Sequence, residues 1–508
     1  MNLSILLKSI VFISDTINYE VSGLQLDSRK LTPGELFIAV QGSHLDGKQY
    51  IAEAIRKGAV AILIEADEKN MTWQDHIPLI PVPALKQKLG HLASRFYGEP
   101  AHHLRMMGVT GTNGKTSCTH FIAQILESFH IHCGLIGTLG AGFYGHLEET
   151  GLTTPDAITV QATLKNFLKH HAKAVAMEVS SHSLDQGRVN DIPFEIGIFT
   201  NLTQDHLDYH GTMAAYAAVK KRFFDEWPMR YAVINADDPY GETWIESLKN
   251  KHQSMFLYGL RKPALAASIP SIYTTHIQLS LQGIKVFLHS PWGEREIALP
   301  LIGQFNLSNV LAVLTALCLY GLPFDEVCDH LAQLKPVPGR MQLFGGDRKP
   351  LVVVDYAHTP DALEKVLEAL RDHTQGKLIC VFGCGGDRDR EKRPHMAAIA
   401  ESLADHVIVT NDNPRHEAPE QIVLEMMKGF KQPECVSVIL DRSQAIEDSI
   451  QLASSGDCVL IAGKGAERYQ QIGDEKIPFD DAEWVKKFLD LHRHSHEDCH
   501  PRESGDLL

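Results

Sequence analysis

The sequence predicts an α/β protein of three domains built on parallel sheets. Its 508 residues correspond to about three domains at roughly 150 residues each. Short β-rich apolar runs alternate with helical patterns from about residue 104, and a second alternating set starts near residue 350. The apolar fraction is 44% and the charged fraction 22%, which excludes a wholly disordered chain, a collagen and a coiled coil.

The first predicted unit spans residues 1–103 and is a smaller domain of mixed α/β structure. Glycine and proline punctuate its short strands. The first residues contain no basic segment before their apolar run, and Lys8 and Asp15 interrupt it, so we do not expect a signal peptide.

The second predicted unit, residues 104–336, is a central domain with a P-loop-type parallel sheet. Its buried strands are predicted at 104–110, 172–179, 196–200 and 231–235. A helix is expected over 115–130, because Phe121, Ile125 and Phe129 fall on one face with their apolar neighbours.

The third predicted unit, residues 337–490, is a Rossmann-like C-terminal domain. The proline-rich stretch Lys335-Pro-Val-Pro-Gly339 reads as the linker before it. Strands are expected at 351–355, 378–383, 406–410, 436–440 and 458–462, and helices at 361–370 and 418–430.

The tail, residues 491–508, has no apolar period and is expected to be disordered. Its composition would also allow metal binding, and a solvated tail without function is the favoured interpretation. The possible ligands are His492, His494, His496, Cys499 and His500.

Charge and cysteine usage exclude several classes of protein. Lys and Arg number 48 against 63 Asp and Glu, a net charge of −15, which disfavours nucleic-acid binding. The nine cysteines are widely spaced without a Cys-x-x-Cys pair, so we expect neither a disulfide framework nor a zinc ribbon. This cysteine usage fits a protein of the reducing cytosol. No run approaches 18 uncharged apolar residues, so no membrane span is expected.

A glycine-rich loop between a predicted strand and a predicted helix is the main chemical signal. It reads Gly108-Val-Thr-Gly111-Thr-Asn-Gly114-Lys115-Thr116. Backbone N–H groups of such a loop face phosphate oxygens, the lysine reaches the β- and γ-phosphates, and the threonine can join a Mg²⁺ shell.

The spacing of this loop departs from the usual phosphate-loop pattern, because Val109 stands where that pattern has its first glycine. An ordinary glycine-rich turn is the alternative interpretation. The predicted ATP-binding residues here are Gly111, Thr112, Asn113, Gly114, Lys115 and Thr116.

The Gly-Thr-Asn-Gly-Lys-Thr segment resembles the Mur ligase family, and the resemblance extends to about residue 490. It implies three domains and an enzyme that makes an amide bond at the expense of ATP, through an acyl phosphate. Within this resemblance Lys115, Glu178, His206 and Lys220 are catalytic. Thr116 and Glu178 hold one Mg²⁺ and His206 a second, while Lys220, four residues after Tyr216, is carbamylated and joins the metal site.

Further segments resemble the family's nucleotide and sugar contacts. Asn306 and Asn309 match the adenine-side element, and Arg340 and Asp355 match phosphate and ribose contacts from the third domain. The segments that resemble UDP-muramyl-peptide contacts contain Leu26, Ser28, His44, Thr153, Thr154, Ser181, Gln186 and Arg188. Turn chemistry alone would also explain many of these polar loop residues.

The tetrapeptide Asp412-Asn-Pro-Arg415 follows a predicted strand and is the most informative segment for the substrate. In the resembled family it marks ligases that take meso-diaminopimelate instead of L-lysine. Position 466 is Ala where the family usually has His. The predicted diaminopimelate-binding residues are Arg388, Asp412, Asn413, Arg415, Gly463 and Glu467.

The resemblance therefore implies an ATP-dependent ligase that adds meso-2,6-diaminopimelate to UDP-MurNAc-L-Ala-D-Glu in peptidoglycan precursor synthesis. We expect a cytoplasmic monomer with a role in cell-wall biogenesis, cell shape and cell division. Three alternatives were weighed: a folylpolyglutamate synthetase, a P-loop motor or switch, and a nucleotide-dependent scaffold without catalysis. The Asp412–Arg415 segment argues against the first, the loop spacing against the second, and the intact Lys115 and Lys220 against the third.

Overall fold

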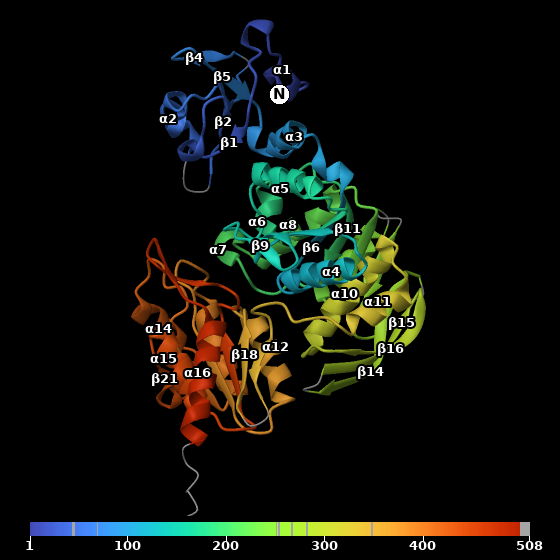
Figure 1. The fold of residues 1–508 in the computed structure, drawn as a ribbon, viewed down its shortest axis with the longest axis vertical. Coiled ribbons are helices and arrows are strands. Elements are labelled where there is room, and N and C mark those ends of the chain that lie inside the picture. The colour runs from blue at the N-terminus through green and yellow to red at the C-terminus, as the bar shows by residue number, and fades with distance from the viewer. Residues whose placement is uncertain are drawn as a thin grey trace, which may run out of the picture.

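Three sheets follow one another along the chain, and each forms the centre of its own domain (Figure 1). The computed structural model describes residues 1–42, 46–68, 70–249, 251, 254–265, 268–280, 283–346 and 349–497. The predicted fold class, an α/β protein of three domains, is confirmed. The boundaries expected at 103 and 336 fall between the sheets, which occupy residues 24–82, 105–299 and 342–462.

The N-terminal domain contains a small mixed sheet with the strand order β1-β2-β3-β5-β4. Its core is the wholly buried strand β2, which lies between parallel neighbours β1 and β3. The strands are β1 (Leu24–Gln25), β2 (Leu36–Ala39), β3 (Ala61–Glu65), β4 (Thr72–Gln74) and β5 (Ile77–Val82), and the helices α1 (Leu3–Leu6), α2 (Ile51–Arg56) and α3 (Leu85–Tyr97).

The central domain has a long sheet with the order β16-β15-β14-β13-β12-β11-β6-β10-β7-β8-β9 among the described residues. The strands from β13 to β7 run parallel, as the sequence predicts. The sequence did not reveal the antiparallel additions β7-β8-β9 and β14-β15-β16. The bounds are β6 (Arg105–Thr110), β7 (Cys133–Gly137), β8 (Gly140–Phe143), β9 (His146–Glu148), β10 (Ala174–Glu178), β11 (Phe194–Phe199), β12 (Tyr231–Asn235), β13 (Met255–Tyr258), β14 (Ser271–Ser280), β15 (Gly283–Ser290) and β16 (Gly293–Leu299).

Two apolar helices, α4 and α10, pack on one face of this sheet, and α4 begins directly after the glycine-rich loop. Helix α4 contacts β6, β7 and β10, and α10 packs against α4 and is apolar on almost every side. This burial fixes the position at which α4 begins. The helices are α4 (Lys115–Ser128), α5 (Ala157–Lys169), α6 (Ser181–Asp185), α7 (Leu207–His210), α8 (Met213–Glu226), α9 (Pro239–Leu248), α10 (Gln304–Tyr320) and α11 (Phe324–Leu331).

The C-terminal domain has the strand order β17-β18-β22-β19-β20-β21, parallel except for the β17–β18 pair. The strand expected at 436–440 is reduced to two exposed residues, because it lies at the sheet edge with one neighbour. The strands are β17 (Gln342–Gly345), β18 (Leu351–Asp355), β19 (Leu378–Phe382), β20 (His406–Val409), β21 (Ser437–Val438) and β22 (Cys458–Ala462), followed by the hairpin β23 (Tyr469–Ile472) and β24 (Glu475–Pro478). The helices are α12 (Pro360–Arg371), α13 (Lys392–Leu403), α14 (Pro419–Met427), α15 (Arg442–Leu452) and α16 (Asp481–Glu497).

The last helix extends past the boundary predicted at residue 490. Val485, Phe488 and Leu489 of α16 pack against the sheet, and the backbone continues as helix to Glu497. A helix whose first turns are buried can continue into polar sequence, so the absence of an apolar period did not end it. Disorder was therefore the wrong prediction for residues 491–497. Residues 498–508, with Cys499 and His500, lie outside the described residues, as do the side chains of His492, His494 and His496.

No helix in the described part of the chain is both long enough and apolar enough to cross a membrane.

Candidate active site

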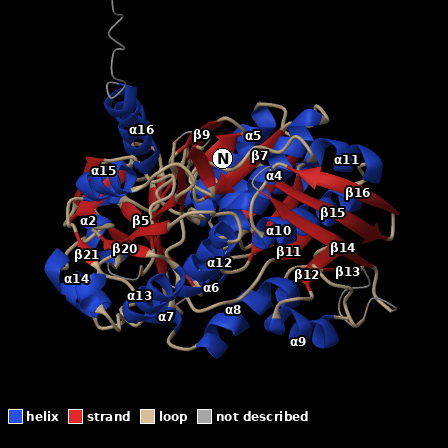
Figure 2. Ribbon diagram, turned by 90° about the horizontal axis from the view of Figure 1, so that it is seen from below, coloured by secondary structure: helices blue, strands red, loops and turns tan. Residues whose placement is uncertain are grey.

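The carboxyl ends of three neighbouring strands, β11, β6 and β10, carry the predicted catalytic residues. The glycine-rich loop follows β6, Glu178 ends β10, and the segment with His206 follows β11. Helices leave β6 and β10 here, and ligand sites of open α/β sheets lie at such points. Helix α12 of the C-terminal domain lies beside this edge, between the two larger sheets (Figure 2).

Two glycines of the loop are required by close packing. Gly111 has φ 146°, and an added Cβ would lie 1.9 Å from the Thr200 hydroxyl oxygen. Gly114, at the start of α4, has φ 87°, and its Cβ would lie 2.4 Å from the side-chain oxygen of Asn309. Asn309, which the sequence predicts as a nucleotide contact, thus packs directly against the loop at Gly114. The loop backbone is held where N–H groups and the α4 terminus can face an anion.

Two lysine amino groups meet at one carbonyl of this loop. Lys115 Nζ donates to the Gly111 and Thr112 carbonyls at 2.9 and 2.8 Å, and Lys220 Nζ donates to the same Gly111 carbonyl at 2.7 Å. Burial and then the Lys115 charge lower the pKa of Lys220 well below its usual value. Burial also lowers the pKa of Lys115. The arrangement favours a neutral amine at Lys220 and favours anions close by.

Helix α8 presents Lys220 to the loop and Lys221 to the opposite side. Lys220 is buried beneath the Tyr216 ring, 4.8 Å from its centroid, and the Tyr216 hydroxyl lies 3.2 Å from Thr112 Oγ1. Lys221 pairs with Asp225 at 2.9 Å. The geometry supports the predicted choice of Lys220 over its neighbour.

Glu178 is buried and fixed by Thr138, a residue that the sequence did not single out. Its two carboxylate oxygens accept hydrogen bonds from the Thr138 N–H at 2.8 Å and the Thr138 hydroxyl at 3.1 Å. A Cβ on Gly137 would lie 2.2 Å from the same carboxylate. The small residue and the hydroxyl therefore position one oriented carboxylate at the end of β10.

His206 belongs to a small network that includes two residues missed at the sequence level. It has a left-handed backbone, φ 54°, and its ring lies 3.3 Å from the Asp205 carboxylate. His358 of the C-terminal domain approaches the same carboxylate at 4.0 Å. Burial lowers the pKa of His206 to about 3 and that of His358 to about 4, so both rings are neutral at pH 7. In the sequence, Asp205 directly precedes His206, and His358 follows Asp355 by three positions, so both residues lie next to predicted site residues.

The predicted metal ligands Thr116, Glu178, His206 and Lys220 surround the loop without forming a ready-made metal cluster. In the described chain no three His, Cys, Asp or Glu side chains gather as a metal-binding group. The Thr116 hydroxyl accepts a hydrogen bond from Arg340 at 3.2 Å. Oxygen donors from Thr116 and Glu178 suit Mg²⁺, and Glu178 is the one carboxylate among the four predicted ligands, so that set is short of negative charge.

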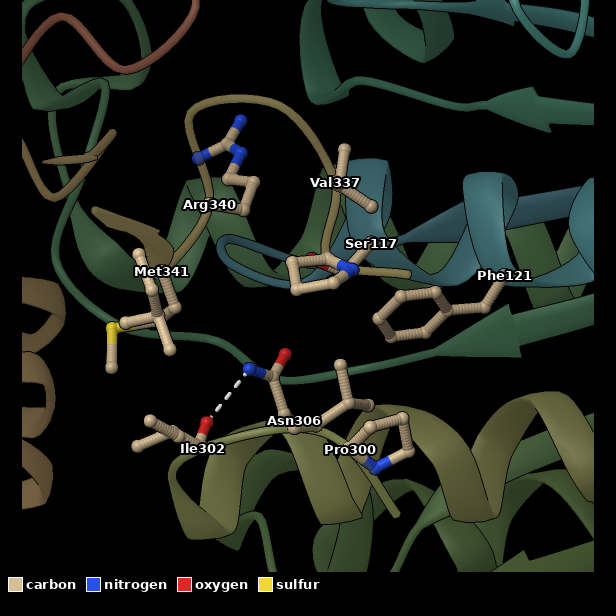
Figure 3. A pocket seen from close by; sticks show the side chains of 11 residues that line it. Ser117, Phe121, Pro300, Ile302, Asn306, Val337, Arg340 and Met341 are labelled. Carbon is tan, nitrogen blue, oxygen red and sulfur yellow. Dashed lines mark hydrogen bonds between the residues drawn. The ribbon is translucent and has the colours of Figure 1, made fainter. Parts of the chain in front are cut away.

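A small cleft opens beside the first turns of α4 (Figure 3). Phe121, Ile302 and Val337 give it an apolar wall, and Asn306 and Arg340 are the polar groups at its rim. Asn306 donates to the Ile302 carbonyl at 2.8 Å. The cleft adjoins the start of α4, and its free space holds little more than one water molecule.

Asp355 lies behind the cleft. Its two carboxylate oxygens already accept hydrogen bonds from the backbone N–H groups of Met341 and Ala357, at 2.7 and 2.8 Å. Arg340 stacks over the Tyr356 ring, 4.1 Å from its centroid. The structure therefore uses Asp355 to hold the Arg340 segment.

The residues predicted to contact a muramyl peptide fall into two groups. Thr154, Gln186 and Arg188 form one network: Arg188 donates to the Thr154 carbonyl at 2.7 Å and to the Gln186 side chain at 2.6 and 3.0 Å. The Ser181 hydroxyl lies 2.9 Å from His210, and the Thr153 hydroxyl 3.2 Å from that of Thr138. This group therefore adjoins Glu178.

The second group lies in the N-terminal domain. Leu26 precedes a short turn, and the Ser28 hydroxyl donates to Glu53 at 2.6 Å. His44 lies outside the described residues. An elongated ligand would be needed to contact both groups.

The C-terminal domain gathers the predicted amino-acid contacts at the ends of β19, β20 and β22. Asn413 donates to Glu467 at 2.8 Å, and the buried Lys464 donates to both Asn413 and Glu467, at 3.0 and 3.2 Å. Burial and the Asp412 charge raise the pKa of Glu467. A Cβ on Gly463 would lie 2.6 Å from the Asp412 carboxylate, so these acidic groups are close together.

The side chains of Arg415 and Arg388 both approach Gly385. An added Cβ at Gly385 would lie 2.8 Å from Arg415 Nη1 and 3.7 Å from Arg388 Cγ. Arg415 donates to the Gly386 carbonyl at 2.8 Å, and Arg388 is exposed, with no hydrogen bond or ion pair to other described residues. The backbone N–H of Ala466 would lie 2.1 Å from a Cβ on Gly339, which places this position at the interdomain linker.

Comparison with known proteins gives matches along most of the chain. Three family models match: Mur ligase family, catalytic domain, at residues 20–97; Mur ligase middle domain at 109–317; and Mur ligase, glutamate ligase domain, at 339–465. The chain is 49% identical over 474 residues to the UDP-N-acetylmuramoyl-L-alanyl-D-glutamate–2,6-diaminopimelate ligase of Coxiella burnetii, covering 93% of this chain and 96% of that protein. It is 50% identical over 467 residues to the ligase of the same name from Pseudomonas aeruginosa, covering 92% and 94%.

A solved structure of a UDP-N-acetylmuramoyl-L-alanyl-D-glutamate–2,6-diaminopimelate ligase superposes with a TM-score of 0.66. It is 36% identical, and the match covers 93% of this chain and 96% of that one.

Gly111→Ala should weaken ATP binding at least about tenfold, because the new methyl group collides with Thr200 and shifts the loop. Titration calorimetry with ATP measures the effect. Gly145→Ala is the matched control: it also has a positive φ, 85°, but no atom lies within 4 Å of its added Cβ. Equal ATP affinities for the two variants would contradict the packing argument.

Proposed function

The chain belongs to the Mur ligase family, and from that premise we propose that it is the ATP-dependent ligase that adds meso-2,6-diaminopimelate to UDP-MurNAc-L-Ala-D-Glu. The reaction joins the D-glutamate carboxylate to an amino group through an acyl phosphate. The observation that carries the proposal is the C-terminal cluster, which brings the side chains of Arg388 and Arg415 to Gly385 and places Glu467 close enough to feel the Asp412 charge. Two relatives with nearly the same length bear the name of this activity and support it.

The first half-reaction transfers the γ-phosphoryl group of ATP to a carboxylate, so it brings anions together. The loop N–H groups and Lys115 bind the phosphates, and the adenine lies near Asn306 at the start of α10. Arg340 reaches from the linker to Thr116 and adds a positive charge at the same point. These groups lower the repulsion between the two reactants.

Mg²⁺ fits the donors at this edge of the sheet, and we infer that Thr116 and Glu178 hold one ion and His206 a second. When bound, the ions neutralise phosphate charge. The Glu178 carboxylate is oriented in advance by Thr138, and the neutral ring of His206 has a lone pair free for coordination.

Carbamylation of Lys220 would supply the missing negative charge. The reaction with CO₂ needs the neutral amine, and the lowered pKa of Lys220 provides it. The product is an anion beside Lys115, where the unmodified amine would meet a like charge. We propose this modification as part of the active enzyme.

The second half-reaction requires a diamino acid held with its attacking amine toward the acyl phosphate. Diaminopimelate has an amino acid group at each end, whereas lysine lacks the far carboxylate. The guanidinium groups of Arg388 and Arg415 suit a carboxylate, and Asp412 and Glu467 suit an ammonium group. The C-terminal domain reaches the phosphate loop through the Asn113–Asp361 hydrogen bond of 3.1 Å, so it can present the amine there.

The sugar-nucleotide substrate is placed by the other two domains. We propose that the uridine diphosphate binds near Leu26 and Ser28, and that the muramyl peptide extends past Thr154 and Arg188 to Glu178. We further propose that the enzyme acts as a cytoplasmic monomer in peptidoglycan precursor synthesis, and so in cell shape and division. The N-terminal domain and the Asp412–Arg415 loop favour this activity over a folylpolyglutamate synthetase, a motor or a scaffold.

ADP release should need the UDP-MurNAc dipeptide and diaminopimelate together, because only the amine consumes the acyl phosphate. The measurement is a coupled ADP assay with ATP, Mg²⁺ and a panel of amino acids that includes L-lysine. Full-rate ATP hydrolysis without the dipeptide would instead support the motor alternative. Preference for a folate acceptor would support the folylpolyglutamate synthetase.

Lys220→Ala should lower kcat by about 100-fold or more, since it removes the proposed carboxylate from the metal site. Added formate or acetate should restore part of the rate. The wild-type protein in labelled bicarbonate should show a carbamate signal by ¹³C NMR that this variant lacks. Lys221→Ala, on the outer face of α8, is the control and should keep its activity. A Lys220→Ala enzyme with normal kcat would end the carbamate proposal.

Arg415→Ala should reduce kcat/KM for diaminopimelate roughly 10- to 100-fold, the value of a charge-assisted hydrogen bond of about 1.5–3 kcal/mol. Lysine has no far carboxylate and should lose far less, so the selectivity between the two should collapse. The measurement is ADP release against the concentration of each amino acid. Equal losses for both amino acids would show that Arg415 supports the fold or the shared head group.

A further inference from the structure

Two loops form the carboxylate side of the proposed diamino acid site, and each contains a non-glycine residue with a left-handed backbone. Asp387 has φ 53° in the loop after β19, and Arg415 has φ 51° in the loop after β20. This conformation is unfavourable for both residue types, and most unfavourable for an arginine. It persists only where surrounding contacts hold it.

The two loops are joined at several points. Gly386 N–H donates to the Asn413 carbonyl at 2.9 Å, and Arg415 donates back to the Gly386 carbonyl at 2.8 Å. The approach is so close that a Cβ on Gly386 would lie 1.9 Å from the Pro414 carbonyl oxygen. The position of Arg415 therefore depends on where the loop after β19 lies.

One buried side chain, Arg393 on α13, holds both loops at once. Its guanidinium makes a two-pronged contact with Glu417, 2.9 Å for each pair of atoms, and donates to the Gly385 carbonyl at 3.0 Å. Glu417 comes two residues after Arg415, and Gly385 lies between the two substrate-side arginines. Glu417 also accepts the Asp387 N–H at 2.6 Å. The side chain of Arg393 is fully buried.

A neighbouring arginine, Arg390, shares the carboxylate of Glu425 with Arg393, so neutralising Glu425 does not by itself explain the contacts of Arg393 with the two loops. Glu425 pairs with Arg393 at 2.6 Å and also with the exposed Arg390. Arg390 lies in the loop after β19, but in the described chain its side chain bonds only Glu425 and does not reach the loop after β20. The feature particular to Arg393 is the link from Gly385 to Glu417.

We propose that Arg393 is a positioning residue that sets the spacing of Arg388 and Arg415 and thereby the selectivity for a diamino acid with a far carboxylate. The inference rests on the proposed function. Arg393 does not contact the substrate. It acts through Gly385 and Glu417, whose contacts hold the two loops, including the left-handed residues Asp387 and Arg415, in place. Small displacements of charge-pairing groups are costly in such sites.

The test compares Arg393→Gln with Arg390→Gln, which removes an arginine from the same Glu425 but leaves the contacts to Gly385 and Glu417 intact. Arg393→Gln should raise KM for diaminopimelate roughly 10- to 100-fold and narrow its preference over lysine. Its KM for ATP and for the UDP-MurNAc dipeptide should stay within about twofold, and kcat should change little. Arg390→Gln should match the wild type in all five quantities.

Circular dichroism and thermal unfolding report whether each variant is folded. Should Arg393→Gln fail to fold, Glu417→Gln tests the same link with a smaller change, and the same rise in KM is expected. A folded Arg393→Gln or Glu417→Gln with an unchanged KM for diaminopimelate overturns the inference. A wild-type enzyme that does not use diaminopimelate overturns the proposed function instead, so the two failures are distinct.

Discussion

The carbonyl oxygen of Gly111 accepts hydrogen bonds from two lysine amino groups, and the rest of the active site depends on this contact. It brings Lys220 of α8 to the phosphate loop, at whose end Lys115 begins α4. Burial lowers the pKa of both lysines, and the Lys115 charge lowers the pKa of Lys220 further. The site is therefore suited to anions: phosphates at Lys115 and a carboxylate-bearing group at Lys220.

The loop that carries this carbonyl is fixed by packing that leaves no room for side chains. Thr200 and Asn309 occupy the space where Cβ atoms of Gly111 and Gly114 would lie. Both neighbours come from elements distant in sequence, the end of β11 and the helix α10. The apolar burial of α4 between sheet and α10 thus determines where the first N–H groups of the helix point.

The third domain takes part in this site through polar contacts with the loop. Arg340 reaches Thr116, His358 approaches Asp205, and Asp361 accepts from Asn113. Each of these contacts joins charged or polar groups across the domain boundary. Such an interface favours relative motion of the domains over a fixed assembly. Closure of this kind excludes water from a reactive phosphoryl intermediate.

The sequence by itself determined the fold class, the three domains and the local identity of the phosphate loop. Local patterns decide these: the alternation of strands and helices, and the glycines between β6 and α4. Its resemblance to the Mur ligase family also indicated Glu178, His206 and Lys220, which local pattern alone would not have singled out. Only the tertiary structure decided which side chains hold the site residues in place. Thr138, His358 and Arg393 each act on a residue from another element, and no local period records such a pairing. The same reason explains the tail, where burial of the first turns of α16 extended the helix into sequence with no pattern of its own.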